Sequence, residues 1–366
     1  MSLNPEVIID LAALKHNASL VAQAAPYSKR LAVIKADAYG HGMLAVAQAL
    51  SMVDGFAVAR LDEAIMLRKA GIKKVVLVLS GFMSQEQVDQ FARYDLDAVV
   101  HSEYQVGLLS SSHLSTPVSV WLKINTGMNR LGVDPSSVTR VYQALQLSGK
   151  VRLPMKLMTH LSCADDMASV STEQQINCFD HCISCLSGEQ SIANSAGLLG
   201  WKNAQRHWVR PGIMLYGGSP FHGAKASDEG LQAVMTFKSQ VISLKTIKKG
   251  SFVGYGATWQ AERTRLIATI GVGYGDGYPR HASVGTPVLV AGQKATMVGR
   301  VSMDSISVDV SQCHNIQIGD EVVLWGVGLP IEEVAEKSNT ISYDLMCGIT
   351  SRVTRVIKEV DDGEQN

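Results

Sequence analysis

The sequence lacks the features that mark membrane, secreted and nucleic-acid-binding proteins. It has no run of about eighteen apolar residues that could span a bilayer. No basic cluster followed by an apolar stretch opens the chain, so we expect no secretory signal and a cytoplasmic location. The 33 basic residues balance 33 acidic ones, and a neutral chain has no broad field to attract nucleic acid or anionic lipid. We therefore expect neither nucleic acid nor a membrane as a partner.

Cysteine is also scarce. Six cysteines in 366 residues do not suggest a disulfide framework. Cys178, Cys182 and Cys185 recur at three- and four-residue steps along a predicted helix, with His181 between them, and could resemble metal ligands. Four side chains on one straight helix cannot easily surround an ion tetrahedrally, so we expect thiols on a helix face and no metal site.

The first part of the chain alternates short β-branched runs with longer helical patterns. Several of the strand-like runs are nearly all apolar, as parallel strands buried on both faces are. Eight such runs are residues 31–35, 55–59, 74–80, 96–101, 118–125, 155–160, 191–194 and 208–216. Helices are expected at 61–70, 85–93 and 136–146, and at 11–24 with Asp10 as N-cap. Eight strand–helix units predict an α/β fold, a (β/α)8 TIM-type barrel.

The pattern changes after residue 232. Strand-like runs then follow one another at 236–244, 265–272, 287–290, 295–301, 305–310 and 321–325. Only 331–337 and 343–347 read as helices, and the polar residues 361–366 are expected to fray. Hydrophobic residues make up 46% of the chain, enough for two cores. We therefore predict a barrel over residues 1–232 and a mostly β domain over 233–366.

Polar residues gather at the ends of the predicted barrel strands, where barrels of this kind form their active sites. Five separate segments bring titratable or hydrogen-bonding groups there, at Lys35, Lys123, His160, Ser195 and Arg210. We expect these side chains to meet at one mouth.

Lys35 directly follows an apolar run. Burial disfavours its ammonium form and makes a nucleophilic amine easier to reach, and such amines form Schiff bases with aldehydes. A lone lysine at a barrel rim, with its charge in water, is the alternative. Ser195, Gly212 and Ile213 lie after the last two strands, where barrels often bind phosphate. A lysine that faces a phosphate site suggests a phosphorylated aldehyde cofactor.

The segment from Lys35 to Gly42, KADAYGHG, closely resembles the cofactor-lysine signature of bacterial alanine racemases. Further motifs match in order through both domains: NTGMNRLG at 125–132, VRPGI at 209–213, GYG at 254–256, GYGDGY at 273–278 and GRVSMD at 299–304. The resemblance implies a (β/α)8 barrel followed by a C-terminal mostly β domain, with pyridoxal 5′-phosphate as cofactor. It also implies interconversion of L- and D-alanine by a homodimer with shared active sites.

The resemblance implies roles for individual residues. Lys35 would hold the cofactor and act as a base on one face of Cα. Racemisation needs a second acid/base, because the proton leaves one face and returns on the other; Tyr255 of the partner subunit matches that group. Arg210 would face the pyridine nitrogen, supported by His160. The phosphate would be held by Tyr39, Ser195, Gly212, Ile213 and Tyr343.

Three further matches concern the substrate. Arg130 and the backbone at Met303 would orient its carboxylate, and Lys123 matches a position that is often carbamylated in the family and would steady Arg130. Asp37 stands where asparagine is commoner and could shift the pKa of Lys35. A structural role is as plausible as an entrance role for Tyr274, Arg280, Arg300 and Asp304, and is favoured for His41, Trp121, Trp208 and Trp325.

Three alternatives remain. A related barrel enzyme that decarboxylates basic amino acids would place a carboxylate against the pyridine nitrogen, which Arg210 speaks against. A broad-specificity racemase of the same fold would resemble this chain closely. A cofactor-carrying barrel without turnover would usually lack a second domain. Whether D-alanine would supply peptidoglycan or alanine would be degraded stays open.

Overall fold

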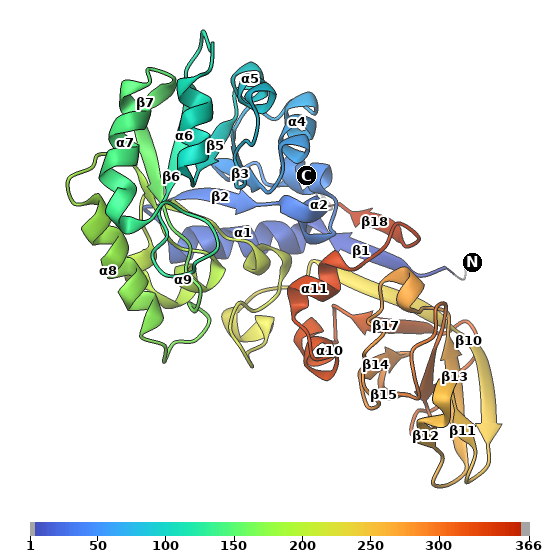
Figure 1. The fold of residues 1–366 in the computed structure, drawn as a ribbon. Coiled ribbons are helices and arrows are strands. Elements are labelled where there is room, and N and C mark those ends of the chain that lie inside the picture. The colour runs from blue at the N-terminus through green and yellow to red at the C-terminus, as the bar shows by residue number, and fades with distance from the viewer. Residues whose placement is uncertain (1–3, 360–366) are drawn as a thin grey trace, which may run out of the picture.

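Two regions make up the described chain, residues 4–359 of the computed structural model: a barrel of strands and helices, and a β-rich domain (Figure 1). The end predicted to fray, 361–366, lies outside the described residues. Within the described part, no helix is long and apolar enough to cross a membrane.

Eight parallel strands close into a barrel, as the alternating pattern predicts. Strands β3 and β5 are buried along their whole length, because helices cover the outside and side chains fill the inside. Pairing of Lys29 with Trp208 closes the ring between its first and last strands. The strands are β2 (Lys29–Val33), β3 (Gly55–Val58), β4 (Val75–Val78), β5 (Asp97–Val100), β6 (Val118–Lys123), β7 (Val151–Met158), β8 (Gln190–Ser191) and β9 (Trp208–Val209).

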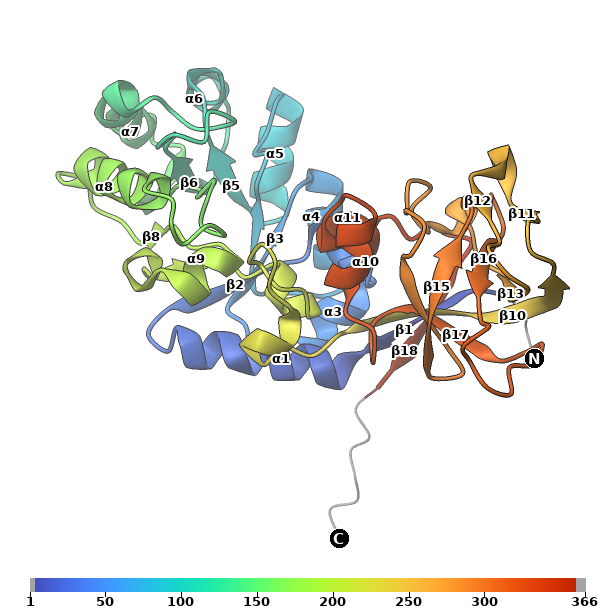
Figure 2. The ribbon, with the colours of Figure 1, turned by 90° about the horizontal axis from the view of Figure 1, so that it is seen from below.

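Helices cover the outside of the barrel between successive strands (Figure 2). The first begins at its predicted cap, because Asp10 Oδ1 accepts hydrogen bonds from the N–H groups of Ala12 and Ala13 at 2.9 and 3.0 Å. The helices of this region are α1 (Leu11–Ala24), α2 (Lys35–Tyr39), α3 (Met43–Ala49), α4 (Leu61–Lys69), α5 (Gln85–Arg93), α6 (Glu103–Ser110), α7 (Val138–Leu147), α8 (Ser171–Ile183) and α9 (Ser195–Gly200).

The predicted eighth strand, 208–216, is wrong beyond Val209. Pro211 has no N–H to donate to a strand ladder, and the backbone turns at Gly212 (φ −124°, ψ −96°) into the 3-10 helix η3, Ile213–Tyr216. All four side chains of η3 are buried. A short apolar run does not distinguish a buried strand from a buried helical turn, which explains the error.

The first barrel strand was also predicted too long. It ends at Val33, and Lys35 begins α2 instead of ending the strand. From Ala36 to Tyr39 the backbone has positive φ angles of 52–54°, so α2 contains a left-handed turn of four residues that are not glycine. Such a conformation costs roughly 1–2 kcal/mol per residue, and surrounding contacts must hold it. We call residues 35–40 the lysine turn.

The second region is built on an eight-stranded sheet in the order β13-β16-β15-β14-β17-β10-β1-β18. Its first strand in the chain, β1, pairs antiparallel with β10 and parallel with β18, so the N-terminal strand belongs to this sheet. The strands are β1 (Glu6–Asp10), β10 (Met235–Ile247), β13 (Arg265–Ile270), β14 (Pro287–Val290), β15 (Gln293–Val298), β16 (Ile306–Asp309), β17 (Glu321–Trp325) and β18 (Thr354–Lys358), with a separate pair, β11 (Phe252–Val253) and β12 (Trp259–Gln260). The mostly β character predicted from the sequence is confirmed.

Two helices of this domain, α10 (Ile331–Lys337) and α11 (Ser342–Cys347), lie between the sheet and the barrel (Figure 1). Helix α11 packs against α2. The approach needs glycine at position 40, because a Cβ there would lie 2.3 Å from the carbonyl oxygen of Met346, and φ is +79°. This contact places Tyr343 and Cys347 beside the lysine turn.

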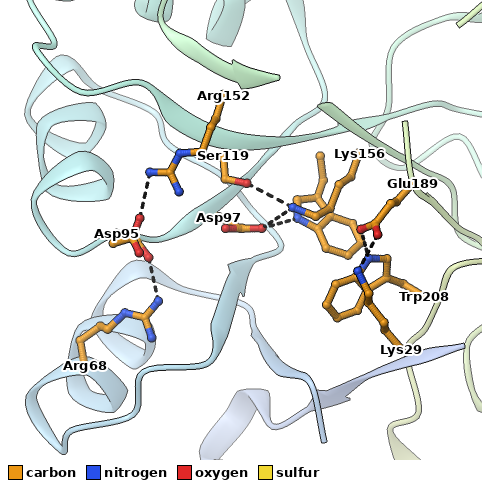
Figure 3. A network of polar contacts seen from close by, with 10 residues as sticks. Lys29, Arg68, Asp95, Asp97, Ser119, Arg152, Lys156, Glu189 and Trp208 are labelled. Carbon is orange, nitrogen blue, oxygen red and sulfur yellow. Dashed lines mark hydrogen bonds and ion pairs between the residues drawn. The ribbon is translucent and has the colours of Figure 1, made fainter. Parts of the chain in front are cut away.

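A polar network fills the opposite, N-terminal end of the barrel (Figure 3). Trp121 and Trp208 are buried there, as predicted, and each also donates a hydrogen bond of 2.7 Å from its indole N–H, to Asp97 and Glu189 respectively. This end is therefore closed by both apolar packing and paired polar groups.

Candidate active site

A cavity of about 510 Å³ opens at the C-terminal ends of the barrel strands. Its volume is in the range of small-molecule and cofactor sites. Ten residues predicted from the sequence line it: Lys35, Tyr39, Lys123, Arg130, His160, Ser195, Arg210, Gly212, Ile213 and Tyr343. Residues from five barrel strand ends and from the β domain thus meet in one place.

The cavity has an unbalanced charge. Four cationic side chains line it, whereas no carboxylate among residues 4–359 does. The cations are Lys35, Lys123, Arg130 and Arg210. Like charges gathered in a partly buried site repel one another, and an anionic ligand would relieve that repulsion.

Lys35 lies at the start of the lysine turn, two residues after the end of β2, whose last three residues are buried. Burial lowers the pKa of its amine, and the nearby Arg130 guanidinium lowers it further. Both effects favour the neutral, nucleophilic amine. The next peptide N–H, of Ala36, donates a 2.7 Å hydrogen bond to Glu63 Oε1, which holds the entrance of the turn.

Asp37 is engaged away from the amine. Its Oδ1 accepts a 2.8 Å hydrogen bond from the N–H of Met43 and so caps α3, and its Oδ2 lies 3.8 Å from the Arg355 guanidinium. The charged groups that shift the pKa of Lys35 are Arg130, Cys347 and Glu63. An effect of Asp37 on the Lys35 pKa, expected from the sequence, is therefore not what the geometry favours.

Arg210 is almost fully buried and is held by oxygen and nitrogen acceptors instead of a carboxylate. Its Nη1 and Nη2 groups donate to Ser191 Oγ, to the carbonyls of Thr159 and Ile192, and to His160 Nδ1, at 2.6, 2.6, 3.0 and 3.3 Å. Burial lowers its pKa to about 10, so it remains a cation at neutral pH. No described residue accepts a hydrogen bond from its Nε–H or from the second hydrogen on Nη1.

His160 complements this cation. Because the guanidinium can only donate, His160 Nδ1 must accept, and the ring proton lies on Nε2. Burial, and then the charge of Arg210, lowers the pKa of His160 well below its usual value. The imidazole is therefore neutral and orients the guanidinium.

Hydroxyl groups converge near Gly212 in the cavity wall. The Gly212 N–H donates a 2.9 Å hydrogen bond to Ser195 Oγ, which leaves the serine proton for another acceptor. A Cβ at Gly212 would lie only 2.7 Å from the Tyr39 hydroxyl oxygen, so glycine permits this approach. Burial raises the pKa of Tyr39, and that of Tyr343 to about 12, so both phenols keep their protons. The group is a set of neutral donors suited to an anion.

Two predicted residues, Tyr255 and Met303, do not line the cavity of their own chain. Both belong to the β domain and are exposed, by 69% and 52% respectively. Tyr255 begins the short turn η5 (Tyr255–Ala257) between β11 and β12, which lie at the end of the β domain remote from the barrel in both views (Figures 1 and 2). Asp304, near Met303, pairs with Arg352 at 2.7 Å. One copy of the chain therefore does not bring all the predicted residues together.

Comparison with known proteins identifies the family. The family pattern described as "Alanine racemase, N-terminal domain" matches residues 9–220, and "Alanine racemase, C-terminal domain" matches 234–357. The chain belongs to the alanine racemase family.

Relatives agree over nearly the whole length. The chain is 46% identical over 349 residues to the alanine racemase of Shewanella piezotolerans, covering 95% of this chain and 98% of that one. It is 47% identical over 345 residues to that of Vibrio vulnificus, covering 94% and 96%. Among solved structures, the biosynthetic alanine racemase of Pseudomonas aeruginosa superposes with a TM-score of 0.95 at 40% identity, covering 98% and 100%. The resemblance seen in the sequence motifs is confirmed.

A racemase of Bartonella henselae, solved with covalently bound pyridoxal phosphate, superposes with a TM-score of 0.87 at 29% identity and covers 98% of this chain and 100% of that chain. All these relatives are named as alanine racemases, an isomerase family, which favours alanine over the broad-specificity alternative.

Three residues in or beside the cavity were not predicted from the sequence. Cys347 lines it and lies one helical turn after Tyr343, a four-residue spacing that could have indicated a shared face. Asn194 lines it and caps α9, accepting a 2.9 Å hydrogen bond from Gly197 N–H. Glu63 supports the lysine turn from outside, and its capping position in α4 gives no signal of that contact.

Proposed function

We propose that this chain interconverts L- and D-alanine with pyridoxal phosphate held covalently by Lys35. The observation that carries the proposal is the mouth of the barrel, where a lysine of lowered pKa follows a buried strand and shares a cavity with three further cations and no described carboxylate. Such a site suits a cofactor phosphate together with a substrate carboxylate.

The residues present fit this cofactor. The hydroxyls of Ser195, Tyr39 and Tyr343 and the backbone N–H of Ile213 provide neutral donors for a phosphate, and Gly212 lets Ser195 and Tyr39 approach it closely. The unused Nε–H of Arg210 suits the ring nitrogen. Pyridoxal phosphate, when bound, draws electrons from Cα of an attached amino acid and weakens the Cα–H bond.

The side chains of this chain supply positioning and proton transfer. Lys35 Nζ, whose pKa burial lowers, would take or return the proton on one face of Cα. Arg210 donates a hydrogen bond to the ring nitrogen but keeps its own proton at neutral pH. Arg130, whose side chain lines the cavity, pairs with the substrate carboxylate.

The opposite face of Cα needs a second group, and we assign it to Tyr255 of the partner subunit. Tyr255 is exposed and lies on the β domain, away from the cavity of its own chain. A homodimer that seats one β domain over the other barrel would complete two sites at once. The Met303 backbone lies on the same domain and would reach the substrate carboxylate from the same direction.

The proposal includes a covalent modification of Lys123, which lines the same cavity. Burial, then the charges of Arg210, Arg130 and Lys35, lowers its pKa to about 8. A neutral amine can add to carbon dioxide, and the resulting carbamate would be an anion beside Arg130. We assign Lys123 this modification.

A labelling experiment tests the role of Lys35. Protein loaded with pyridoxal phosphate and reduced with borohydride should carry the label on the peptide that contains Lys35, and Lys35→Ala should abolish both label and racemisation of L-alanine. Lys156→Met, at the far end of the barrel, is the matched control and should be labelled like the unaltered protein. A label found on another lysine, or racemisation by Lys35→Ala, would contradict the proposal.

A mixing experiment tests the shared site. Lys35→Ala and Tyr255→Phe should each be inactive alone, and exchange of subunits between them should restore part of the activity, because one of the two mixed sites keeps both groups. No recovery in a mixture shown to contain hybrid dimers would remove the shared site.

A further inference from the structure

Tyr216 is a buried side chain directly behind the lysine turn. It lies at the end of η3, has no exposed surface and does not line the cavity. Its hydroxyl donates a 2.9 Å hydrogen bond to the carbonyl of Val33, the last residue of β2 and two residues before Lys35. Its ring stacks on Tyr39 with a centroid distance of 4.7 Å and an interplanar angle of 29°. Tyr216 therefore contacts both ends of the segment that carries the cofactor lysine.

His41 supports the same segment from its other side. Its Nδ1 lies 3.0 Å from the Ala38 carbonyl oxygen and 2.9 Å from that of Tyr39, so it must carry the proton and donate to both. Burial lowers its pKa to about 4, which keeps the ring neutral. Its ring lies 4.6 Å from that of Tyr216. The structural role favoured for His41 from the sequence fits this geometry.

The left-handed conformation of the lysine turn requires stabilising contacts from other parts of the chain. Its four left-handed residues carry side chains, so contacts from outside must stabilise them. Glu63 binds the N–H of Ala36 at the start, and Arg355 Nε donates a 2.9 Å hydrogen bond to the Gly40 carbonyl at the end. Between these two points, His41 binds the turn directly and Tyr216 packs on Tyr39.

We infer that Tyr216 and His41 form a brace that positions two groups for the reaction, the Lys35 amine and the Tyr39 hydroxyl. Tyr216 fixes the end of β2 before Lys35. His41 fixes the carbonyls of Ala38 and Tyr39, which flank the α-carbon of Tyr39. Neither touches the cavity, so both are positioning residues. The inference deepens the proposed function and rests on Lys35 as the cofactor lysine.

A tyrosine that only fills the core provides the control. Tyr278, in the β domain, is 1% exposed and packs 6.2 Å from Trp325, ring to ring. Its hydroxyl has no hydrogen-bond partner among the described residues. Tyr216→Phe and Tyr278→Phe thus remove the same atom from two buried rings, but only the first change removes a hydrogen bond.

The main measurement is the binding of pyridoxal phosphate to cofactor-free protein, together with the pH titration of the bound cofactor's absorbance. Tyr216→Phe should weaken cofactor binding roughly fivefold, the loss expected for one neutral hydrogen bond, and should move the absorbance midpoint. Its kcat should fall while KM for alanine changes little. Tyr278→Phe should match the unaltered protein in every measurement. Equal behaviour of the two variants would overturn the brace.

A second pair of variants decides the case if Tyr216→Phe does not fold. His41→Asn keeps an N–H donor near the position of Nδ1, whereas His41→Leu removes it. The brace predicts that the asparagine variant retains the absorbance midpoint and most of the cofactor affinity that the leucine variant loses. Equal loss in both would contradict it. Labelling of a lysine other than Lys35 in the unaltered protein would instead contradict the proposed function, so the two failures are distinguishable.

Discussion

The two ends of the barrel hold similar numbers of cations but differ in whether carboxylates pair with them. At the N-terminal end three cations each pair with a carboxylate (Figure 3): Lys29 with Glu189 at 2.5 Å, Lys156 with Asp97 at 3.2 Å and Arg152 with Asp95 at 3.0 Å. A fourth, Arg68, donates to the backbone carbonyl of Asp95. At the mouth, four cations line a cavity without a described carboxylate. The first arrangement is complete in the folded chain, whereas the second leaves its cations without a described carboxylate partner, as a site for an anionic ligand requires.

Aromatic side chains strengthen the closed end. The Lys156 ammonium lies 5.3 Å from the centre of the Trp121 ring, and that of Lys29 lies 5.1 Å from Trp208. Burial alone would raise the pKa of Glu189, but hydrogen bonds from Lys29 and Trp208 lower it overall. Cationic side chains without a carboxylate partner thus indicate a binding site in this barrel, whereas cations that pair with carboxylates stabilise the fold.

Removing one cation from each end gives the sharpest test of this difference. Arg130→Met should lower kcat/KM for alanine about a thousandfold, about 4 kcal/mol, since charge-assisted hydrogen bonds to the substrate carboxylate are lost. Arg152→Met should leave kcat/KM unchanged. Steady-state kinetics check both, and similar losses in the two variants would break the comparison.

Much of the mouth could be predicted from the sequence, because lysine, histidine and arginine stand at the ends of strands whose apolar pattern is plain. The ion pairs at the N-terminal end of the barrel could not be predicted in this way. Lys29 and Glu189 lie 160 positions apart, and no local pattern links them. Such pairs arise only when the barrel closes and brings the start of β2 close to the residue that precedes β8.

The lysine turn was also beyond sequence reasoning. Ala36, Asp37 and Ala38 have no intrinsic preference for positive φ, and the contacts that hold them come from α4, η3 and β18. The eighth strand failed for a related reason, since burial makes η3 apolar whatever its backbone. Tertiary contacts decide the conformation in both places.

Breaking a pair at the closed end should affect stability and not chemistry. Asp97→Ala leaves the half-buried Lys156 ammonium and the fully buried Trp121 indole N–H without their shared acceptor. The free energy of unfolding should fall by about 3 kcal/mol, with kcat unchanged. Denaturant unfolding measures this.

The exposed pair Arg140–Glu103 supplies the control for that experiment. Glu103→Ala should leave the stability nearly unchanged, because exposed ion pairs contribute little. If Asp97→Ala were as stable as Glu103→Ala, the contacts of Asp97 would contribute no more to the stability of the barrel than an exposed ion pair does.

Mild acid should lower the free energy of unfolding first through the buried histidines near the mouth, and only at lower pH through the carboxylates of the closed end. The folded-state pKa of His41 is about 4 against an ordinary 6.5, so below pH 6.5 the unfolded chain binds a proton that the folded chain does not. Stability therefore falls as the pH drops from 6.5 towards 4, by about 2 kcal/mol at pH 5 from His41, and His160 adds to it. The lowered pKa of Glu189 keeps its contribution until the pH falls below its usual 4.5.

Urea unfolding at pH 7, 6 and 5 measures this slope. His41→Asn should show a shallower fall between pH 7 and 5, since one of the buried neutral imidazoles is gone. An unaltered protein equally stable at pH 7 and pH 5, or a variant with the same slope, would be contrary to the assignment.

The smallest expected effect concerns the one anion that the mouth could acquire by itself. With a pKa of about 8, Lys123 is half neutral at pH 8, and its Nζ can bond to the carbon of CO2, releasing a proton and leaving a carbamate beside Arg130. Labelled bicarbonate should give a carbamate carbon resonance that is absent from Lys123→Met, and kcat/KM should fall about threefold in CO2-free buffer, as expected for one weakened charge contact. A resonance that survives in Lys123→Met would place the modification elsewhere. The mouth would then depend on its ligands alone for negative charge, and its contrast with the paired end of the barrel would be complete.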